Sequence, residues 1–401
     1  MLDRPAARRS AIAPFHVMDV LAAAKERQRT HGDLVSLGAG QPSSDAPAPV
    51  LAAAAEALRA GGLGYTEQFG VPELRSAIAG HYLRTHGLPV TGDDVVVTTG
   101  SSGGFLLAFL AAFDPGDRVA IGRPGYPAYR NILTALGCEV VDLPCGPDTR
   151  FQPTVAMLDE LTEPIRGLVV ASPANPTGTV LPPAELAALA HWCDDHDVQL
   201  VSDEIYHGIT FGAAVDCAWR TSRDAIVINS FSKYWSMTGW RLGWMLLPER
   251  LRSAVGALTG NFTICPPALP QLAAVAAFDP ESYAEADQHV ADYRVNRDVL
   301  LAGLPQLGID RLAPADGGFY VYADVSHLTS DSMAFCQQLL KDTGVAIAPG
   351  IDFDPVNGGR FVRMSYAGAA EDMHTALARL GDWLATRLLA GTQPVPGSFS
   401  Q

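Results

Sequence analysis

The residues best suited to chemistry lie in the stretch 229–244, which reads Asn-Ser-Phe-Ser-Lys-Tyr-Trp-Ser-Met-Thr-Gly-Trp-Arg-Leu-Gly-Trp. Lys233 lies there among serines and aromatic residues, and burial in such surroundings lowers the proton affinity of an amine and makes it a nucleophile toward a carbonyl. Arg241 follows eight residues later and, with Ser230 and Ser232, is suited to bind a phosphate. A carbonyl-seeking lysine beside a phosphate site predicts pyridoxal phosphate as the cofactor, the alternative being an ordinary surface lysine.

Four more candidates have the groups that such a cofactor requires. Asp203 ends an apolar run, where a carboxylate is costly unless it meets a cation such as a protonated pyridine nitrogen. Asn175 and Tyr206 can hydrogen-bond the cofactor's phenolic oxygen, and Tyr126 can stack on its ring. The alternatives are a helix-capping aspartate, an ordinary Asn-Pro turn and an aromatic residue packed on the core.

A glycine-rich turn forms a second candidate anion site. Residues 94–98 predict a strand that runs into Thr-Gly-Ser-Ser-Gly-Gly at 99–104 and then into an apolar helix. Free N–H groups and the helix dipole converge at such a turn. The spacing matches neither GxGxxG nor GxxxxGK[ST], so it indicates neither a dinucleotide fingerprint nor a Walker loop. A simple turn without a ligand is the alternative.

Repeated alternation of strands and helices predicts the fold. A short strand is expected within 34–42, and further strands at 94–98, 118–121, 139–143, 167–171, 199–202, 225–230 and 242–247. Helices are expected from 13 to about 24 and near 47–60, 70–86, 127–137, 154–162, 182–196 and 248–259. This order predicts an α/β fold with a mainly parallel sheet between helices. Ligands of such sheets bind at the carboxyl ends of the strands, where the candidates above lie.

The pattern changes after about residue 280, where a long charged helix precedes short strands and helices near 331–342 and 370–390. Helices beside short strands predict a smaller α+β domain. We therefore divide the chain into an N-terminal arm with part of the small domain (1–44), a large cofactor-binding domain (45–282), a small C-terminal domain (283–390) and a disordered tail (391–401).

Composition excludes several classes of protein. Of the 401 residues 48% are hydrophobic and 18% charged, which is typical of a globular enzyme. The net charge of −15 argues against nucleic acid or an anionic membrane as a partner. The six cysteines are scattered, no metal-ligand spacing appears, and the apolar run 104–113 is too short to span a bilayer. We expect a cytoplasmic protein with reduced thiols and no metal.

Three motifs, at 175–178, 203–206 and 230–241, resemble those of the class I/II aminotransferases of pyridoxal-phosphate fold type I. They read Asn-Pro-Thr-Gly, Asp-Glu-Ile-Tyr and Ser-Phe-Ser-Lys-Tyr-Trp-Ser-Met-Thr-Gly-Trp-Arg, and the resemblance runs from about residue 12 to 388. It implies that Lys233 carries the aldimine and moves the proton at the substrate α-carbon. It implies further cofactor contacts, with Asp203 at the pyridine nitrogen, Asn175 and Tyr206 at the phenolic oxygen, and Ser230, Ser232, Arg241 and the backbone of Ser101 and Ser102 at the phosphate.

The resemblance also implies an assembly and a substrate site. Family members are homodimers with active sites at the interface, and Tyr65 matches the tyrosine that reaches the phosphate of the partner subunit. Arg363 matches the arginine that binds the substrate α-carboxylate as a bidentate fork. Gly40 matches the glycine whose backbone lies against the substrate. The implied reaction is a ping-pong exchange of an amino group between an amino acid and a 2-oxo acid.

The substrate is predicted from the expected pocket lining. Residues 12–18, 37–40 and 261–265 contain no Lys or Arg, and His16 is the one possible cation. A second substrate carboxylate would lie unpaired there. We therefore expect a neutral amino acid, valine or alanine, with pyruvate or 2-oxoglutarate, in line with a resemblance to valine–pyruvate and aspartate types within the family.

Other functions on the same scaffold stay open from the sequence. An aspartate aminotransferase requires a pocket cation from an unassigned helix, and a carbon–sulfur β-lyase differs only in details around the lysine. A pyridoxal-binding transcriptional regulator requires a DNA-binding module, whereas only about 12 residues precede the matched region and the net charge is −15.

Overall fold

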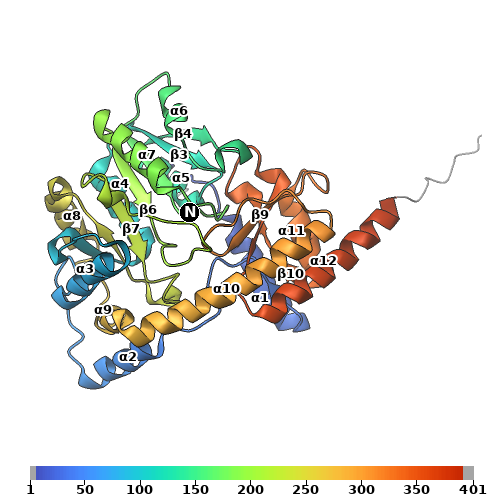
Figure 1. Cartoon of the computed structure of the whole chain (residues 1–401), viewed down its shortest axis with the longest axis horizontal. Coiled ribbons are helices and arrows are strands. Elements are labelled where there is room, and N and C mark those ends of the chain that lie inside the picture. The colour runs from blue at the N-terminus through green and yellow to red at the C-terminus, as the bar shows by residue number, and fades with distance from the viewer. Residues whose placement is uncertain (1–5, 392–401) are drawn as a thin grey trace, which may run out of the picture.

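A seven-stranded sheet forms the centre of the molecule (Figure 1). The structure is a computed structural model and describes residues 6–391. The sheet has the order β2-β8-β7-β6-β5-β3-β4. Its strands are β2 (Val95–Thr98), β3 (Arg118–Arg123), β4 (Glu139–Pro144), β5 (Gly167–Ala171), β6 (Gln199–Asp203), β7 (Ile226–Ser230) and β8 (Gly243–Leu246).

All strands of this sheet except β8 run in the same direction. Parallel pairs join β4 to β3, β3 to β5, β5 to β6 and β6 to β7, whereas β8 is antiparallel to both of its neighbours, β7 and β2. The mainly parallel sheet is thus confirmed, with strand 243–246 as the exception. β8 follows β7 after the short lysine-containing loop, and a loop without a crossover helix returns the chain antiparallel.

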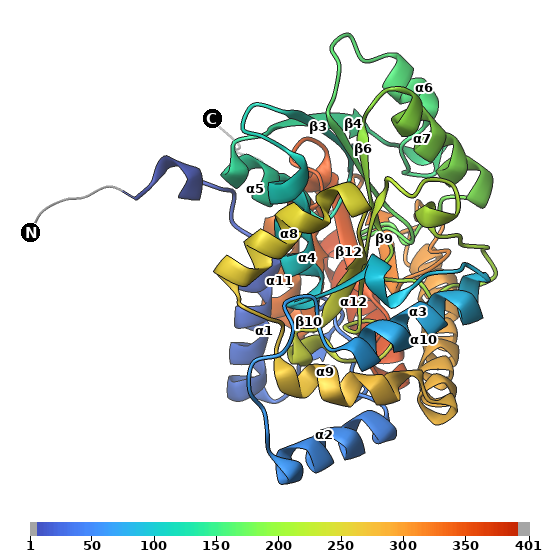
Figure 2. The same ribbon diagram turned by 90° about the vertical axis from the view of Figure 1, so that its left-hand side faces the viewer.

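Helices cover both faces of the sheet (Figure 2). Side chains alternate between two buried clusters: Leu200 of β6 belongs to the cluster that contains Leu74 and Leu189, and its neighbour Val201 belongs to the cluster that contains Phe105 and Val255. The helices of this part are α2 (Ala48–Ala60), α3 (Pro72–His86), α4 (Gly100–Ala112), α5 (Pro127–Leu136), α6 (Val155–Asp159), α7 (Pro183–Asp195), α8 (Glu249–Phe262) and α9 (Ala268–Ala274).

The remaining elements combine both ends of the chain. A three-stranded antiparallel sheet has the order β11-β12-β9, and β1 pairs in parallel with β10. The strands are β1 (Val35–Ser36), β9 (Tyr320–Asp324), β10 (Val345–Ala346), β11 (Ala348–Pro349) and β12 (Phe361–Ser365). The helices are α1 (His16–His31), α10 (Pro280–Gln306), α11 (Ser332–Thr343) and α12 (Ala370–Gly391). The domain limits stay a prediction, and the one at 282/283 falls inside α10.

The structure corrects the predicted limits of two helices and one strand, and most of the predicted tail lies outside the described residues. The first helix begins at His16 rather than at residue 13, because Phe15 is extended, with φ −101° and ψ 90°. The helix expected over 154–162 ends at Asp159. The predicted first strand is only two residues long. Of the predicted tail, Gly391 ends α12, and 392–401 lie outside the described residues.

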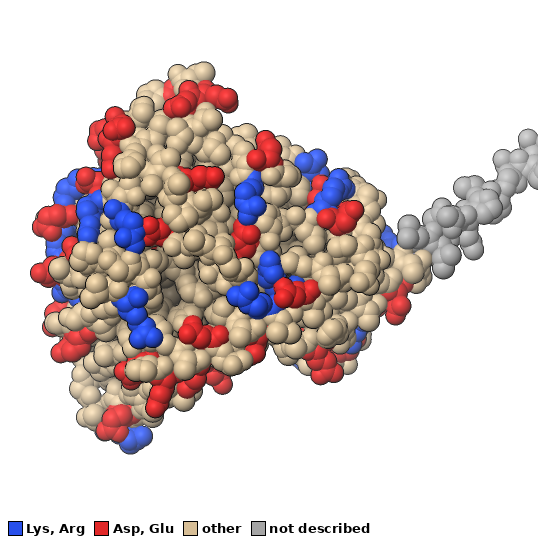
Figure 3. Space-filling view, viewed as in Figure 1, with Lys and Arg blue, Asp and Glu red and all other residues tan. Residues whose placement is uncertain are grey.

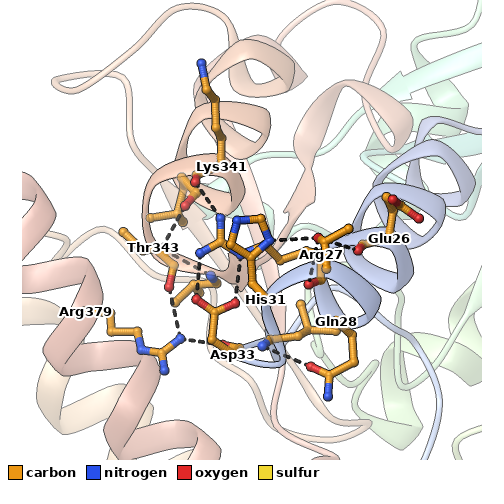
Figure 4. A network of polar contacts seen from close by, with 12 residues as sticks. Glu26, Arg27, Gln28, His31, Asp33, Lys341, Thr343 and Arg379 are labelled. Atoms are coloured by element: carbon orange, nitrogen blue, oxygen red, sulfur yellow. Dashed lines mark hydrogen bonds and ion pairs between the residues drawn. The ribbon is translucent and has the colours of Figure 1, made fainter.

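A polar network anchors the C-terminal end of α1 (Figure 4). Arg27 Nε and Nη2 donate to the Asp33 carboxylate at 2.7 and 2.6 Å, and Nη1 donates to the Lys341 carbonyl at 2.8 Å. Arg379 Nη1 donates to the carbonyls of Asp33 and Thr343 at 2.6 and 2.9 Å. The network fixes α1 against α11 and α12, elements that lie more than 300 residues away in the chain.

Charged side chains of both signs are spread over the surface. On the face drawn in Figure 3, basic side chains lie among acidic ones. Within residues 6–391, the structure contains no helix that is long and apolar enough to cross a membrane.

An aromatic cluster underlies the lysine loop. Phe231 is fully buried, and its ring lies 5.3 Å from Trp235, 4.9 Å from Trp244 and 5.7 Å from Phe278. These contacts attach the loop to β8 and to the chain after α9.

We expect Phe231→Ala to lower the free energy of unfolding by about 3–5 kcal/mol, the usual cost of deleting a buried aromatic ring. Urea unfolding followed by circular dichroism measures it. Leu83→Ala, on the exposed side of α3, serves as the control and should change the free energy little. Equal effects of the two substitutions would contradict the role assigned to the aromatic cluster.

Candidate active site

A cavity of about 640 Å³ opens at the carboxyl ends of the parallel strands. It collects most of the residues singled out from the sequence. Those that line it are Gly40, Ser101, Ser102, Tyr126, Asn175, Asp203, Tyr206, Ser232, Lys233, Arg241 and Arg363. Ser230 and Tyr65 are absent from the lining. The parallel sheet accounts for this convergence, because the ends of β5, β6 and β7 lie at one edge.

Lys233 lies in the cavity wall, just after β7. Its Nζ donates to the Gly40 carbonyl at 2.6 Å and lies 5.7 and 5.8 Å from the ring centres of Tyr206 and Phe319. Burial and, to a smaller extent, the Arg363 cation lower the pKa of the Lys233 amine to about 8, against the opposing effect of the Asp203 carboxylate. The amine therefore becomes neutral at a much lower pH than an ordinary lysine.

Asp203 is the last residue of β6 and is almost completely buried. Its Oδ2 accepts a hydrogen bond from the Tyr129 hydroxyl, and its Oδ1 accepts one from the Ile205 N–H at 3.1 Å. Burial raises the pKa of this carboxyl to about 6, against the effect of these two hydrogen bonds and of Lys233. A carboxylate in this position is stabilised by any cation that enters the cavity beside it.

Tyr129 is a site residue that sequence reasoning missed. It lies one helical turn after Tyr126 on α5, and the two rings meet edge to face at 5.4 Å. The spacing of three residues, which brings side chains of a helix together, was the available signal. Its bond to Asp203 spans 74 residues, and no local pattern indicates it.

Arg363, on β12, is buried and held on both sides. Nη1 donates to Asn175 Oδ1 at 2.9 Å, and Nη2 donates to the Gly38 carbonyl at 2.8 Å. The guanidinium lies 4.3 Å from the ring centre of Tyr320. Its Nε, also buried, has no hydrogen-bond partner among the described residues. A buried cation with a free donor is suited to an anionic ligand.

A second part of the cavity is suited to an anion. Gly100, with φ +68°, begins α4, and a Cβ placed there would lie 2.6 Å from Arg241 Nη2. A side chain at this position would displace the arginine, so glycine allows the helix N-terminus and the guanidinium to approach each other. Ser101 and Ser102 follow in the first turn, where N–H groups are free of helical partners.

Two predicted phosphate contacts lie outside the cavity lining. Ser230 Oγ is buried 2.9 Å from Ser232 Oγ and 3.1 Å from the Leu242 carbonyl, so in this geometry it supports Ser232. Tyr65 lies in the chain between α2 and α3 with 82% of its surface exposed. Its contact with a partner subunit stays a prediction.

Tyr320, on β9, is a second residue of the cavity lining that sequence reasoning missed. Its hydroxyl lies 2.7 Å from the Tyr206 hydroxyl, and a Cβ added to Gly40 would lie 2.5 Å from it. Glycine at position 40 thus lets the backbone pass close to this tyrosine. The pairing joins residues 114 apart in the chain, beyond the reach of local sequence signals.

The rest of the lining is mainly apolar and differs in part from the pocket expected from the sequence. Phe15, Val17, Met18 and Leu21 line it from α1 and the residue before that helix, and Ala39 lies beside Gly40. Ile12, His16 and residues 261–265, which were expected to contribute, are absent from the lining. The cations in the lining are Lys233, Arg241 and Arg363. The described residues also hold no cluster of His, Cys, Asp or Glu suited to a metal.

Comparison with known proteins places the chain in a family. A family model described as aminotransferase class I and II matches residues 32–380. The chain is 66% identical over 386 residues to the valine–pyruvate aminotransferase of Mycobacterium tuberculosis, with 96% of this chain and 99% of that protein covered. It is 35% identical over 376 residues to the aspartate/prephenate aminotransferase of Thermus thermophilus, with 93% and 96% covered.

Solved structures agree with this placement. A crystal structure of an aminotransferase from Mycobacterium tuberculosis matches with a TM-score of 0.94 at 66% identity, covering 96% of this chain and all of the other. Aspartate aminotransferase from Thermus thermophilus with maleate matches with a TM-score of 0.89 at 35% identity, covering 94% and 99%. The fold type I architecture is therefore confirmed. The chain belongs to the class I and II aminotransferases and is an aminotransferase.

Proposed function

We propose that this aminotransferase uses pyridoxal phosphate to exchange an amino group between a neutral L-amino acid, valine or alanine, and a 2-oxo acid, pyruvate or 2-oxoglutarate. The observation that carries the proposal is the content of one cavity. It joins a lysine with a lowered pKa, a buried carboxylate and a buried arginine with a free donor to a wall of apolar side chains.

The residues present fit pyridoxal phosphate. Asp203, buried and without a cationic hydrogen-bond partner of its own, would hold a protonated pyridine nitrogen. Arg241, Ser232 and the N-terminus of α4 would hold the phosphate, because Gly100 leaves them room. Tyr126 would cover one face of the ring. When bound, the cofactor supplies an aldehyde and a ring that withdraws electrons from the substrate α-carbon.

The chain's own groups then control binding and proton transfer. Lys233 Nζ, neutral above about pH 8 in the protein without cofactor, would take the proton from the substrate α-carbon and deliver it to the aldehyde-derived carbon of the cofactor, and would move a proton in the opposite direction in the second half of the exchange. The side-chain oxygen of Asn175 is already engaged, because Asn175 Oδ1 accepts a hydrogen bond from Arg363 Nη1. This leaves the Asn175 amide NH₂, with the Tyr206 hydroxyl, to donate to the cofactor's phenolic oxygen.

The cavity supports a neutral substrate. Arg363 is the cation available for the α-carboxylate, while Arg241 lies at the phosphate end and Lys233 acts on the α-carbon. No fourth Lys or Arg lines the cavity within residues 6–391. A second carboxylate would therefore lose its hydration without a partner. The name of the 66% identical relative, valine–pyruvate aminotransferase, supports the same choice.

Aspartate is the second candidate for the amino donor. The observation in its favour is the set of relatives named as aspartate or aspartate/prephenate aminotransferases, which are 29–35% identical. In this chain such a substrate requires a cation from elsewhere, for example from a second subunit.

The proposal includes a cytoplasmic homodimer with active sites at the interface. Exposed apolar side chains on neighbouring segments support it, since the chain after α2 contacts the chain after α8 through the Thr66 N–H, which donates to Cys265 Sγ at 3.4 Å. They lie on α2, on the chain that follows it and at the end of α8, and include Leu58, Leu63, Tyr65, Phe262 and Ile264. A surface of this kind favours association with another protein. Six cysteines without disulfides are in keeping with a reducing compartment.

The titration of Lys233 tests the proton-transfer role. The chain has three lysines, Lys25, Lys233 and Lys341, so reductive methylation with ¹³C-formaldehyde yields few signals to assign by NMR. In the protein without cofactor, the Lys233 signal should titrate near pH 8. Arg363→Gln removes a cation and should raise this midpoint, whereas Asp203→Asn removes an anion and should lower it. A midpoint at the ordinary value of 10.5 would refute the assigned role.

Half-reactions test the substrate. Valine or alanine, mixed with cofactor-loaded protein and no acceptor, should abolish the visible absorbance of lysine-linked cofactor and release one 2-oxo acid per site. Aspartate should react at least about a hundredfold less efficiently, because its second carboxylate would lie unpaired. Reaction with aspartate alone would exclude the neutral substrate. Release of ammonia would instead indicate a lyase. Lys233→Ala serves as the control and should show neither the band nor the reaction.

A further inference from the structure

The first turn of α1 forms one wall of the active-site cavity. Phe15, just before the helix, meets Tyr126 edge to face at 6.2 Å. Val17 is buried in one cluster with Tyr322 and Phe353, and Met18, which also lines the cavity, is largely exposed. If Arg363 holds the α-carboxylate and Lys233 lies at the α-carbon, this turn is the apolar surface left for the substrate side chain.

This turn is held by a residue from the far end of the chain. Phe15, at the N-cap position, provides no side-chain cap for α1. Instead the N–H groups of His16 and Val17 donate to Oδ1 and Oδ2 of Asp352 at 2.8 and 2.5 Å. A carboxylate bound by two free N–H groups at the positive end of a helix is a favourable arrangement. The helix start is thus fixed by a contact across more than 300 residues.

Asp352 is in turn tied to the strand that carries Arg363. It ends the 3-10 helix η7 (Gly350–Asp352), which directly follows β11, and Ala348 of β11 pairs with Arg363. A Cβ on Gly350 would lie 2.5 Å from the carbonyl oxygens of Gly358 and Phe361, so this backbone is tightly enclosed. One short segment therefore relates the carboxylate-binding arginine to the apolar turn. Asp352 itself is absent from the cavity lining.

We propose that Asp352 is a positioning residue for the substrate side chain: by capping α1 across the fold, it holds Phe15, Val17 and Met18 at a fixed distance from Arg363 and thereby sets the preference for a branched aliphatic side chain. The inference rests on the proposed function. It concerns selectivity among neutral amino acids and involves no contact between Asp352 and the substrate.

The two ends of α1 provide a matched pair of variants. Asp352→Asn keeps one acceptor oxygen and loses the charge and the second acceptor at the cavity end. Asp33→Asn does the same at the opposite end, where the carboxylate binds Arg27 (Figure 4). Both substitutions weaken the anchoring of one helix, but only the first acts on the turn that lines the cavity. A purely structural role of the anchoring predicts equal effects.

Half-reactions of cofactor-loaded protein with valine and with alanine measure the effect. Asp352→Asn should raise the half-saturating concentration of valine about tenfold and that of alanine less than about threefold, with maximal rates within about twofold, because alanine reaches less of the apolar wall. Asp33→Asn should leave both concentrations unchanged. The ratio of the half-saturating concentration of valine to that of alanine is the decisive quantity. If this ratio is unchanged in Asp352→Asn, or changes equally in Asp33→Asn, the proposal is overturned.

Two further measurements keep the proposal testable whatever the first variant does. Met18→Ala, at a largely exposed position that tolerates truncation, should raise the same ratio of half-saturating concentrations, because it too removes apolar surface, even if Asp352→Asn folds poorly. Hydrogen exchange of the peptide spanning 15–21 should be faster in Asp352→Asn than in Asp33→Asn. If the unmodified protein fails to react with valine and alanine, the proposed function fails. Faster exchange would then still support the capping contact, and equal exchange would refute it.

Discussion

The buried carboxylate of Asp203 is the constraint on which the site depends. At the end of an inner strand it has lost most of its hydration, and burial moves its pKa to about 6 despite hydrogen bonds from Tyr129 and Ile205. Lys233, on the neighbouring strand end, is shifted the opposite way, to about 8. Both pKa shifts favour the uncharged forms of the two side chains. A ligand that brings a cation to the Asp203 carboxylate and a carbonyl group to the Lys233 amine would therefore be stabilised in the cavity.

The sheet order explains why these groups meet. β5, β6 and β7 are adjacent and parallel, so Asn175, Asp203 and Lys233, which follow or end these strands, reach the same edge. The lysine loop then turns directly into β8, which lies antiparallel between β7 and β2 and brings Arg241 close to Gly100. The reversal of one strand thus joins the lysine and the anion site within a single loop.

The sequence predicted the strand-end residues because apolar runs, glycine-rich turns and isolated polar residues are local signals. It missed Tyr129, Tyr320 and Asp352 because their partners lie 74, 114 and more than 300 residues away. The start of α1 was placed too early for the same reason, since its cap comes from Asp352. The direction of β8 depends on the lack of a crossover, which strand composition does not encode.

The proposed function depends most on the covalent role that we propose for Lys233. Borohydride reduction of the cofactor-loaded protein converts a carbon–nitrogen double bond between lysine and cofactor into a stable single bond, and peptide mass spectrometry then locates the modified residue. The account predicts modification of Lys233 and not of Lys25 or Lys341, the other two lysines of the chain. Modification of either of those lysines instead, or no modification in protein that retains the cofactor, would contradict it.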